Sequence, residues 1–353
     1  MLKISLEETV AGIGPLDGEA MAAAGARQDE LIKPKGSLGM LEDISVRLAG
    51  IFSQNKPTIE NKIHILAAGD HGVVVEGVSA YPQEVTPQMV MNFLAGGAAI
   101  NVLARHVDVR VIVVDAGVNA ELPPHPDLIS MPAGRGTANM AQGPAMSLEQ
   151  ARLCIENGIS IAAREIESGA DLIGTGDMGI GNTTAASAIT SVICDIDPLE
   201  VTGLGAGIAE DQREHKANVI RKAIDLNRPD PSDGLDVLTK LGGFEIGFLA
   251  GVMLGAAAAG RPVLIDGFIS GAAALIAYTI CPAAKDYMIA SHLSVERGHG
   301  HALQHIGLKP ILDLGMRLGE GTGAALAMLI VEAAAKCLAE MPTFAEAGVS
   351  DKE

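Results

Sequence analysis

The sequence predicts an α/β protein in which helices cover both faces of a parallel, Rossmann-like sheet, with a small helical domain formed by both chain termini. Three observations carry this prediction. Short aliphatic runs alternate with longer helical segments after residue 62, each run is followed by a loop rich in Gly, Asp or Ser, and both chain ends carry helical patterns. Continuous apolar runs are typical of strands that helices bury on both faces.

The N-terminal region is expected to be helical. Ser5 and Glu8 form a capping-box pattern, Pro15 is expected to open a helix that runs through about Ile32, and Ser37 is expected to cap another. Apolar residues follow Ser37 at helical spacing. The polar stretch QNKPTIENK then predicts a linker to the next part of the chain.

Strands and helices alternate beyond this linker. The strand candidates are Ile63–Ala68, Val109–Asp115, Asp171–Thr175, Pro262–Asp266 and Tyr287–Ala290. The helix candidates are Gln88–Arg105, Ser147–Glu167, Thr183–Cys194, Glu210–Leu226, Glu245–Ala259 and Gly323–Glu340. We therefore expect residues 56–328 to form a large α/β domain, and residues 1–55 and 329–353 to form the small helical one.

Composition excludes several classes of protein. The 353 residues are 48% hydrophobic and 3% aromatic, and 43 Asp and Glu against 25 Lys and Arg give a formal net charge of -18. Such a surface repels phosphate backbones, so we expect no nucleic acid partner, and the apolar content is too high for a disordered chain. The 4 Cys are widely spaced without a CxxC pair, which argues against a disulfide framework or a zinc module.

One uncharged segment, residues 267–284, reaches the lower length limit of a membrane span. Gly and Ala dominate it and Pro282 ends it, so we expect a helix buried inside the protein and no membrane association. The first residues lack the apolar run of a signal peptide. A cytoplasmic location is therefore expected.

A polar loop follows each strand candidate: AAGDHG, DAGVN, GTGDMGIGNTT, DGFISG and ASHLS. Ligands of open parallel sheets bind just outside the carboxyl ends of the strands. The five loops therefore predict one composite site at that edge of the sheet. Ordinary turn chemistry also places Gly and Asp after strands, but it explains the length of residues 174–184 less well.

Two glycine-rich segments suggest nucleotide binding. GTGDMG, residues 174–179, matches the dinucleotide pattern GxGxxG, and Asp195 lies near the spacing of a ribose-binding acid, so an NAD(P)-binding oxidoreductase is one alternative. Against it, Asp177 would place a negative charge beside a pyrophosphate. TGLGAGI, residues 202–208, precedes a helix that carries Lys216, which suits either a phosphate site or a plain turn with a solvated Lys.

The histidines near the C-terminal part of the sheet raise the question of a metal. His292, His299, His301 and His305 lie close together, and the last two would share one helical face. Glu296 is the one acid near them, and spacing alone does not give a ligand set. We expect no metal site here.

Two further features have both a structural and a functional interpretation. Glu320 stands between glycines at the start of a helical run, where it either complements the helix dipole or acts as a base toward a bound ligand. Ser79, Tyr81 and Gln88 lie beside Met and Phe residues, as expected of a slot for a flat heterocycle. Methionines at such spacing also fill cores.

Six segments, in order along the chain, resemble the nicotinate-nucleotide–dimethylbenzimidazole phosphoribosyltransferase family: KPKGSLGMLE, AGDHGVVVEGVSAYPQEVTPQMV, GTGDMGIGNTT, LIDGFISGAAAL, SHLSVERGH and RLGEGTGAALAM. The resemblance implies a homodimer that transfers phosphoribose from nicotinate mononucleotide to 5,6-dimethylbenzimidazole. The products are α-ribazole 5′-phosphate and nicotinate, with inversion at C1′. The pyridinium leaves as a neutral ring, so neither a metal nor another cofactor is expected.

The resemblance also implies roles for particular residues. Glu320 is the general base. Matches to the benzimidazole pocket are Ser79, Tyr81, Gln88 and Leu318, and matches to the phosphate, ribose and nicotinate sites are Asp177, Gly179, Asn182, Gly205, Lys216, Asp266 and Ser291. Position 177 is commonly Glu in the family and is Asp here, which leaves its role open. A nucleotide- or corrinoid-binding protein without enzyme activity is the remaining alternative.

Overall fold

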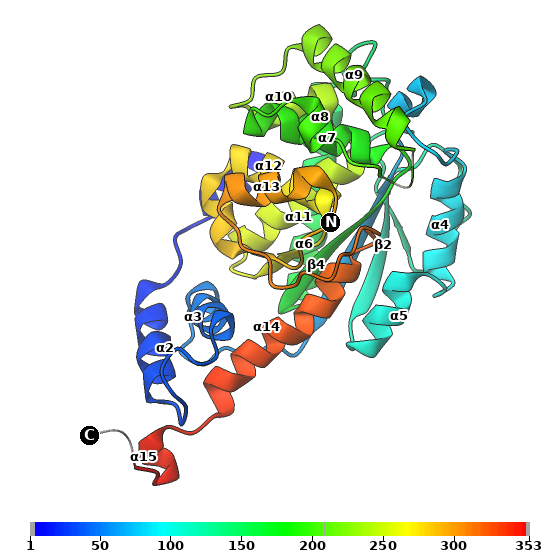
Figure 1. The fold of residues 1–353 in the computed structure, drawn as a ribbon. Helices are drawn as coiled ribbons and strands as arrows, with labels where there is room; N and C mark the ends of the chain where they lie inside the picture. Colours follow the sequence, from blue (N-terminus) through cyan, green and yellow to red (C-terminus); the bar gives the residue numbers. More distant parts are fainter. Residues whose placement is uncertain (1–3, 206, 208, 351–353) are drawn as a thin grey trace.

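The computed structural model describes residues 4–205, 207 and 209–350. Within these residues six parallel strands form one sheet in the order β3-β2-β1-β4-β5-β6 (Figure 1). The strands are β1 (Lys62–Gly69), β2 (Arg110–Gly117), β3 (Leu128–Ser130), β4 (Leu172–Met178), β5 (Val263–Ile265) and β6 (Met288–Ala290). The predicted α/β fold with a Rossmann-like parallel sheet is confirmed.

Helices connect the strands and cover both faces of the sheet. Their bounds are α1 (Leu6–Gly12), α2 (Gly18–Glu30), α3 (Met40–Phe52), α4 (Val85–Leu94), α5 (Ala99–His106), α6 (Leu148–Glu167), α7 (Asn182–Cys194), α8 (Pro198–Val201), α9 (Glu210–Asn227), α10 (Gly234–Leu241), α11 (Phe244–Ala258), α12 (Phe268–Ile280), α13 (Arg297–Ile306), α14 (Thr322–Glu340) and α15 (Phe344–Ala347). Short 3-10 helices, η1 and η2, span Gly72–Glu76 and Pro282–Tyr287.

Strand β1 contributes to two apolar cores, one on each face of the sheet. Ile63, Ile65 and Ala67 pack on the side of α6, α11 and α12, whereas Leu66 and Ala68 pack on the side of α4, α5 and α14. All five side chains are buried. Alternate residues of a strand face opposite sides, so a strand covered on both sides has no polar stripe.

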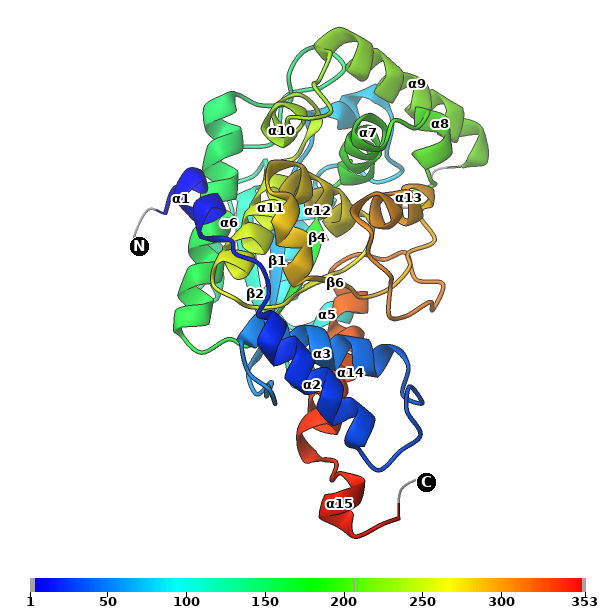
Figure 2. The same cartoon turned by 90° about the vertical axis from the view of Figure 1, so that its left-hand side faces the viewer.

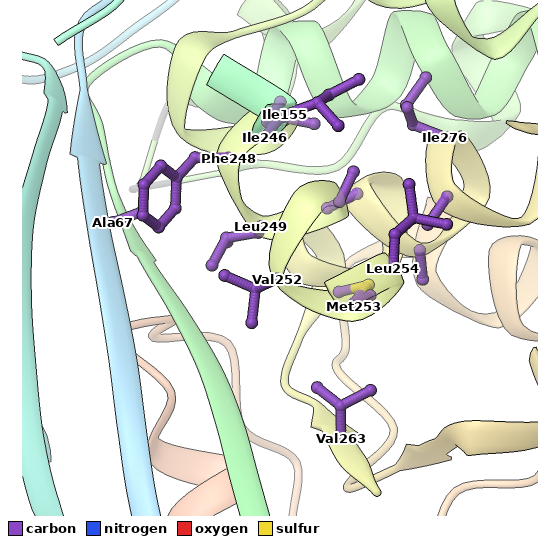
Figure 3. Packing of buried hydrophobic residues seen from close by; sticks show 14 of the residues in the cluster. Ala67, Ile155, Ile246, Phe248, Leu249, Val252, Met253, Leu254, Val263 and Ile276 are labelled. Atoms are coloured by element: carbon purple, nitrogen blue, oxygen red, sulfur yellow. The ribbon is translucent and has the colours of Figure 1, made fainter. Parts of the chain in front are cut away.

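Helix α11 forms the centre of the first core. It is buried from Phe244 to Ala257, and Phe248 faces Ala67 of β1 (Figure 3). Burying a side chain of this size stabilises the fold by about 1.5–3 kcal/mol. On the other side of α11, Gly158 of α6 lies so close that an added Cβ would overlap the Phe248 carbonyl oxygen. Backbone therefore packs directly on backbone between α6 and α11.

The two chain ends form a small helical part beside the sheet, as predicted. Helices α2 and α3 pack against α14, and the Arg27 guanidinium donates to the Leu338 and Met341 carbonyls, at 3.0 and 2.9 Å (Figure 2). Helix α1 lies apart from them, against α6 and α11, and its Leu6 belongs to the first core. The division of the chain at residues 55 and 328 stays a prediction.

Several element boundaries differ from the prediction. The helix expected over Gln88–Arg105 is two helices, α4 and α5, because the glycines at 96 and 97 interrupt it, with a φ of 76° at the first. Ser37 does not cap α3, which follows Gly39, and the helix expected from Pro15 starts after Asp17, whose side chain accepts from the Ala20 N–H at 3.0 Å. Strand β3 was not predicted.

The uncharged segment 267–284 forms α12, which is buried among α7, α10, α11 and α13. Among the residues that the structure describes, α14 is long and apolar enough to cross a membrane by length and composition. Its contacts with α3, α5, β4 and β5 are those of a helix that packs inside a protein core.

We expect Gly158→Ala to lower the free energy of unfolding by about 1–3 kcal/mol or more, because the new methyl group must push α11 away from α6. Gly25→Ala on α2 is the matched control, since its added Cβ meets nothing within 4 Å. It should raise stability by about 0.5–1 kcal/mol. Urea unfolding followed by circular dichroism measures both, and an unchanged Gly158→Ala protein would contradict the close helix contact.

Candidate active site

The strand order reverses between β1 and β4, and the loops after these two strands lie next to each other. Asp70 and His71 follow β1, and residues 179–181 connect β4 to α7. The backbone carbonyl of Gly69 packs so closely on Gly179 that a side chain there would overlap it. Such a reversal point is where open α/β sheets bind ligands.

Glu320 lies at this edge in a strained turn. It has a φ of 61°, between Gly319 at 85° and Gly321 at 93°, and α14 starts at the next residue. The left-handed conformation costs a non-glycine residue about 1–2 kcal/mol. The surrounding structure therefore holds this side chain against its own backbone preference, which is common at functional sites.

The Glu320 carboxylate is buried, and a backbone N–H group of α5 compensates part of the cost of burying its charge. Its Oε2 accepts from the Ile100 N–H of α5, at 3.1 Å, so it lies at the positive end of that helix. Burial nevertheless raises the pKa of Glu320, and the nearby charge of Asp266 raises it further, against the α5 amides. An acid with a raised pKa next to open strand ends is suited to accept a proton from a ligand.

His64 of β1 supports the turn from inside the sheet. Its Nε2 lies 3.0 Å from the Glu320 carbonyl oxygen, and a Cβ at Gly321 would overlap its ring. Burial lowers the pKa of His64 to about 4, so the ring is neutral at neutral pH, and Nε2 carries the hydrogen that it donates to the carbonyl.

Asp177 and Asp266 lie near Glu320 on the neighbouring strand ends. Asp177 Oδ2 accepts from the Asn182 side chain at 3.0 Å, and Oδ1 has no partner among the described residues. Burial raises the pKa of Asp177 well above its ordinary value, and the charges of Asp266, Glu245 and Glu320 add to this rise. Asp177, Asn182, Asp266 and Glu320 therefore lie together as a group of interacting side chains at the strand ends.

Asp266 is bound to the turn itself. Its Oδ2 accepts from the Gly321 N–H at 3.1 Å and its Oδ1 from the Ala324 N–H at 2.9 Å, so it caps α14. Ser291 lies beside it and donates to the Ile265 carbonyl at 2.6 Å. Both residues are fully buried and are engaged with backbone groups.

A second group of residues gathers at the start of α7. Lys216 of α9 is only 1% exposed, and its Nζ donates to Thr183 Oγ1 at 2.6 Å. The Gly205 backbone passes beside both groups, and the Arg317 guanidinium donates to the Gly205 carbonyl at 3.3 Å. A buried ammonium, a hydroxyl and a helix N-terminus together suit a phosphate group. Of the TGLGAGI segment, Ala206 and Ile208 lie outside the described residues.

The residues expected in the benzimidazole pocket are more exposed. Leu318 is 59% exposed and Tyr81 is 51% exposed, and the Ser79 hydroxyl donates to the Tyr81 carbonyl at 3.1 Å. Gln88 lies on α4, whose first turn is held to the strand-end loop because the Ile180 N–H donates to Thr86 Oγ1 at 3.1 Å. The joint pocket of these four residues stays a prediction.

The structure gives the GTGDMG glycines a different use from the dinucleotide pattern. Gly174 and Gly176 lie within β4, and side chains at these positions would overlap His64 and the Glu320 backbone. These two glycines therefore leave room for the Glu320 turn, and not for a pyrophosphate. Asp195 follows the C-terminal end of α7, roughly 20 Å of helix away from the glycine loop. It is not placed to bind a ribose there.

The histidine cluster divides into buried and peripheral members. His299 Nδ1 accepts from the Ser294 N–H at 3.0 Å, and His292 Nε2 lies 3.7 Å from Asp266 Oδ1. His305 packs edge-on against the Tyr278 ring. In the described part of the chain, no group of three or more His, Cys, Asp or Glu side chains is arranged to hold a metal ion.

Sequence reasoning missed several buried polar groups. His71 Nε2 lies 2.6 Å from Glu245 Oε1 beneath the strand-end loops, and Asp70 accepts from the Asn119 N–H at 2.9 Å. Burial lowers the pKa of His71, but the Glu245 carboxylate outweighs it, so the pKa is raised overall. These partners lie far apart in the sequence, so spacing offered no signal.

Comparison with known proteins agrees with this geometry. A family model described as Phosphoribosyltransferase matches residues 13–349, so the fold and the site are those of the phosphoribosyltransferase class. The nicotinate-nucleotide–dimethylbenzimidazole phosphoribosyltransferase of Chloroflexus aurantiacus is 60% identical over 98% of this chain and 99% of its own, and that of Dehalococcoides mccartyi is 56% identical over 99% of both. The crystal structure of CobT from Thermus thermophilus superposes with a TM-score of 0.91 at 48% identity, covering 95% of this chain and all of that one. The chain belongs to the nicotinate-nucleotide–dimethylbenzimidazole phosphoribosyltransferase family.

We expect the pKa values of the buried histidines to be shifted in opposite directions. Burial lowers the pKa of His64 to about 4 and that of His299 to about 3, so both rings should stay neutral at pH values where an exposed His is protonated. His71, beside Glu245, should remain protonated above the usual His range. Nitrogen-15 shifts of labelled histidines, assigned with single His→Gln variants, measure this. A protonated His64 near about pH 6 would contradict the lowered pKa, and a neutral ring with its hydrogen on Nδ1 would contradict the hydrogen bond to the Glu320 carbonyl.

Proposed function

We propose that this chain transfers the phosphoribosyl group of nicotinate mononucleotide to 5,6-dimethylbenzimidazole, giving α-ribazole 5′-phosphate and nicotinate. One observation carries the proposal: a strained turn holds the buried Glu320 carboxylate at the ligand-binding edge of the sheet. The names of the curated relatives support the two substrates. A cytoplasmic homodimer is proposed as the working form.

The reaction needs a base because the attacking ring carries a proton. One nitrogen of the benzimidazole forms a bond to C1′ of the ribose, and the C1′–nitrogen bond of the nicotinate ring breaks with its electron pair going to nicotinate. The proton on the other benzimidazole nitrogen passes to the Glu320 carboxylate. Attack and departure on opposite faces invert C1′. General base catalysis of this kind contributes about 10²–10⁴-fold in rate.

The remaining predicted residues would position the two substrates. Lys216 and Gly205, with Thr183 beside them, are proposed to bind the phosphate, since Nζ and the Thr183 hydroxyl already lie 2.6 Å apart. Ser79, Tyr81, Gln88 and Leu318 are proposed to border the benzimidazole. Gly179 is proposed to belong to the same phosphate site, and Asp266 and Ser291 to line the ribose and nicotinate. Asp177 and Asn182 are proposed to border the bound nucleotide. Holding both rings in line supplies much of the remaining rate.

Glu320→Gln should lower kcat by about 10²–10⁴-fold, because the amide cannot accept the ring proton. Nicotinate release from nicotinate mononucleotide and dimethylbenzimidazole, measured with a chelator present, tests this. Since burial raises the pKa of Glu320, activity of the parent should fall as pH falls through that raised value, when the carboxylate becomes protonated.

Glu332→Gln on the same helix, α14, is the matched control for charge. Its carboxylate pairs with Lys62 and Lys336 on the outer part of the helix, so turnover should stay near that of the parent. If Glu320→Gln kept near-normal kcat with an unchanged circular dichroism spectrum, another group would be the base.

Lys216→Met should raise the KM for nicotinate mononucleotide by about 10–100-fold, the effect of losing one charge-assisted hydrogen bond. Burial lowers the pKa of Lys216 to about 8, so the parent's KM should itself rise as the pH increases above that value and the ammonium loses its proton. Lys222→Met, exposed on the same helix, is the control and should leave KM and its pH dependence unchanged. An unchanged KM in Lys216→Met would remove Lys216 from the phosphate site.

A further inference from the structure

Glu296 is a buried acid to which the proposed reaction assigns no role. It directly precedes α13, is 8% exposed, and its carboxylate packs on Gly203, where an added Cβ would overlap Oε2. Within the described part of the chain, Oε2 has no hydrogen-bond partner. An unpaired buried carboxylate oxygen is costly, so it indicates a group that binds there in the working state.

The groups around this carboxyl are those of the proposed phosphate site. Burial raises the pKa of Glu296, while Lys216 of α9, the Gly205 N–H and Arg317 act against that rise. Lys216 Nζ donates to Thr183 Oγ1, and within the described residues it forms no direct ion pair with Glu296. His299 of α13 adds no charge, since burial lowers its pKa to about 3.

A phosphate ester at Lys216 would therefore meet the Glu296 carboxyl. The ester is a dianion at neutral pH, because its second pKa is about 6. Two like charges in a buried site disfavour each other, so one of the two groups takes up a proton. A phosphate that pairs with Lys216 takes the support of this cation away from Glu296, whose pKa burial already raises, so the proton goes to the carboxyl. A protonated carboxyl gains an O–H group, which can donate to a phosphate oxygen, whereas an ionised one can only accept.

We propose that Glu296 determines how this site binds phosphate: the dianion enters together with one proton, which ends on the Glu296 carboxyl and is donated in a hydrogen bond to a phosphate oxygen. The inference rests on the proposed function, because it assumes that the phosphate lies beside Lys216. Glu296 acts as a positioning and specificity-determining residue and does not touch C1′. Phosphate affinity therefore falls as pH rises and this proton becomes harder to supply.

The test compares ribose 5-phosphate binding by the parent and by Glu296→Gln, using calorimetry between about pH 6 and 8. This ligand has no leaving group and is not consumed. The ratio of the parent Kd to the Glu296→Gln Kd should rise by up to about 10-fold per pH unit, the slope for one linked proton. Titration of the ligand is common to both proteins and cancels in the ratio. Since the Glu296 charge raises the pKa of Lys216, the ratio is compared at the lower pH values, where Lys216 keeps its proton in both proteins. Glu200→Gln, exposed on α8, should give a ratio that does not change with pH.

A pH-independent ratio, or weaker binding by Glu296→Gln at every pH, would overturn the inference. Infrared difference spectra of the parent provide a test that needs no variant: ribose 5-phosphate should increase the carbonyl stretch of a protonated carboxyl, and no increase would also overturn it. If the parent failed to bind ribose 5-phosphate at all, the proposed function would fail as well. Binding with a flat ratio would remove only the role of Glu296.

Discussion

The capping of α14 by Asp266 is the interaction on which the site depends. Asp266 accepts from the Gly321 and Ala324 N–H groups at the end of β5, while His64 of β1 binds the Glu320 carbonyl. Two strands thus fix the backbone on either side of Glu320, which keeps a φ of 61° that the residue would not adopt freely. The sheet thus sets the direction of the Glu320 side chain, and α14, which follows, holds the turn rigid.

Three acids, Asp177, Asp266 and Glu320, are buried close together and dominate the electrostatics of the site. Burial raises the pKa of Asp177, Asp266 and Glu320, and the Asp266 charge raises the pKa of the other two further, whereas His292 acts against the rise at Asp266. Interacting acids of this kind share protons, so their titration belongs to the group rather than to one residue. Backbone amides support the ionised forms of Glu320, from α5, and of Asp266, from the start of α14, whereas burial raises the pKa of Asp177 well above its ordinary value. Glu320 is therefore better suited than Asp177 to be ionised.

The sequence predicted the parts of the fold that depend on local pattern. Apolar runs marked the long central strands, and polar loops marked the carboxyl edge. It missed β3, which has three residues and little burial, and it joined α4 to α5 because helical periodicity continues across the glycines that separate them. His64 illustrates a deeper limit: its partner is 256 residues away, and nothing in its own strand distinguishes it from a core residue. Asp177, Asn182 and Glu320 were predicted as site residues from the distinctive sequences of their loops and Lys216 from the glycine-rich segment before α9, and their roles stay predictions.

Asp177, where the resemblance to the family leads us to expect Glu, has contacts of its own in this structure. Asp177 Oδ2 accepts from Asn182 at the start of α7 and lies beneath Gly319, so the acid connects the β4 loop to the Glu320 turn. Oδ1 of Asp177 has no partner among the described residues, and the raised pKa of Asp177 leaves it able to carry a proton, which would let it donate a hydrogen bond without adding charge beside Glu320. Asp177 thus supports the Glu320 turn through Oδ2, while Oδ1 stays available to a bound ligand.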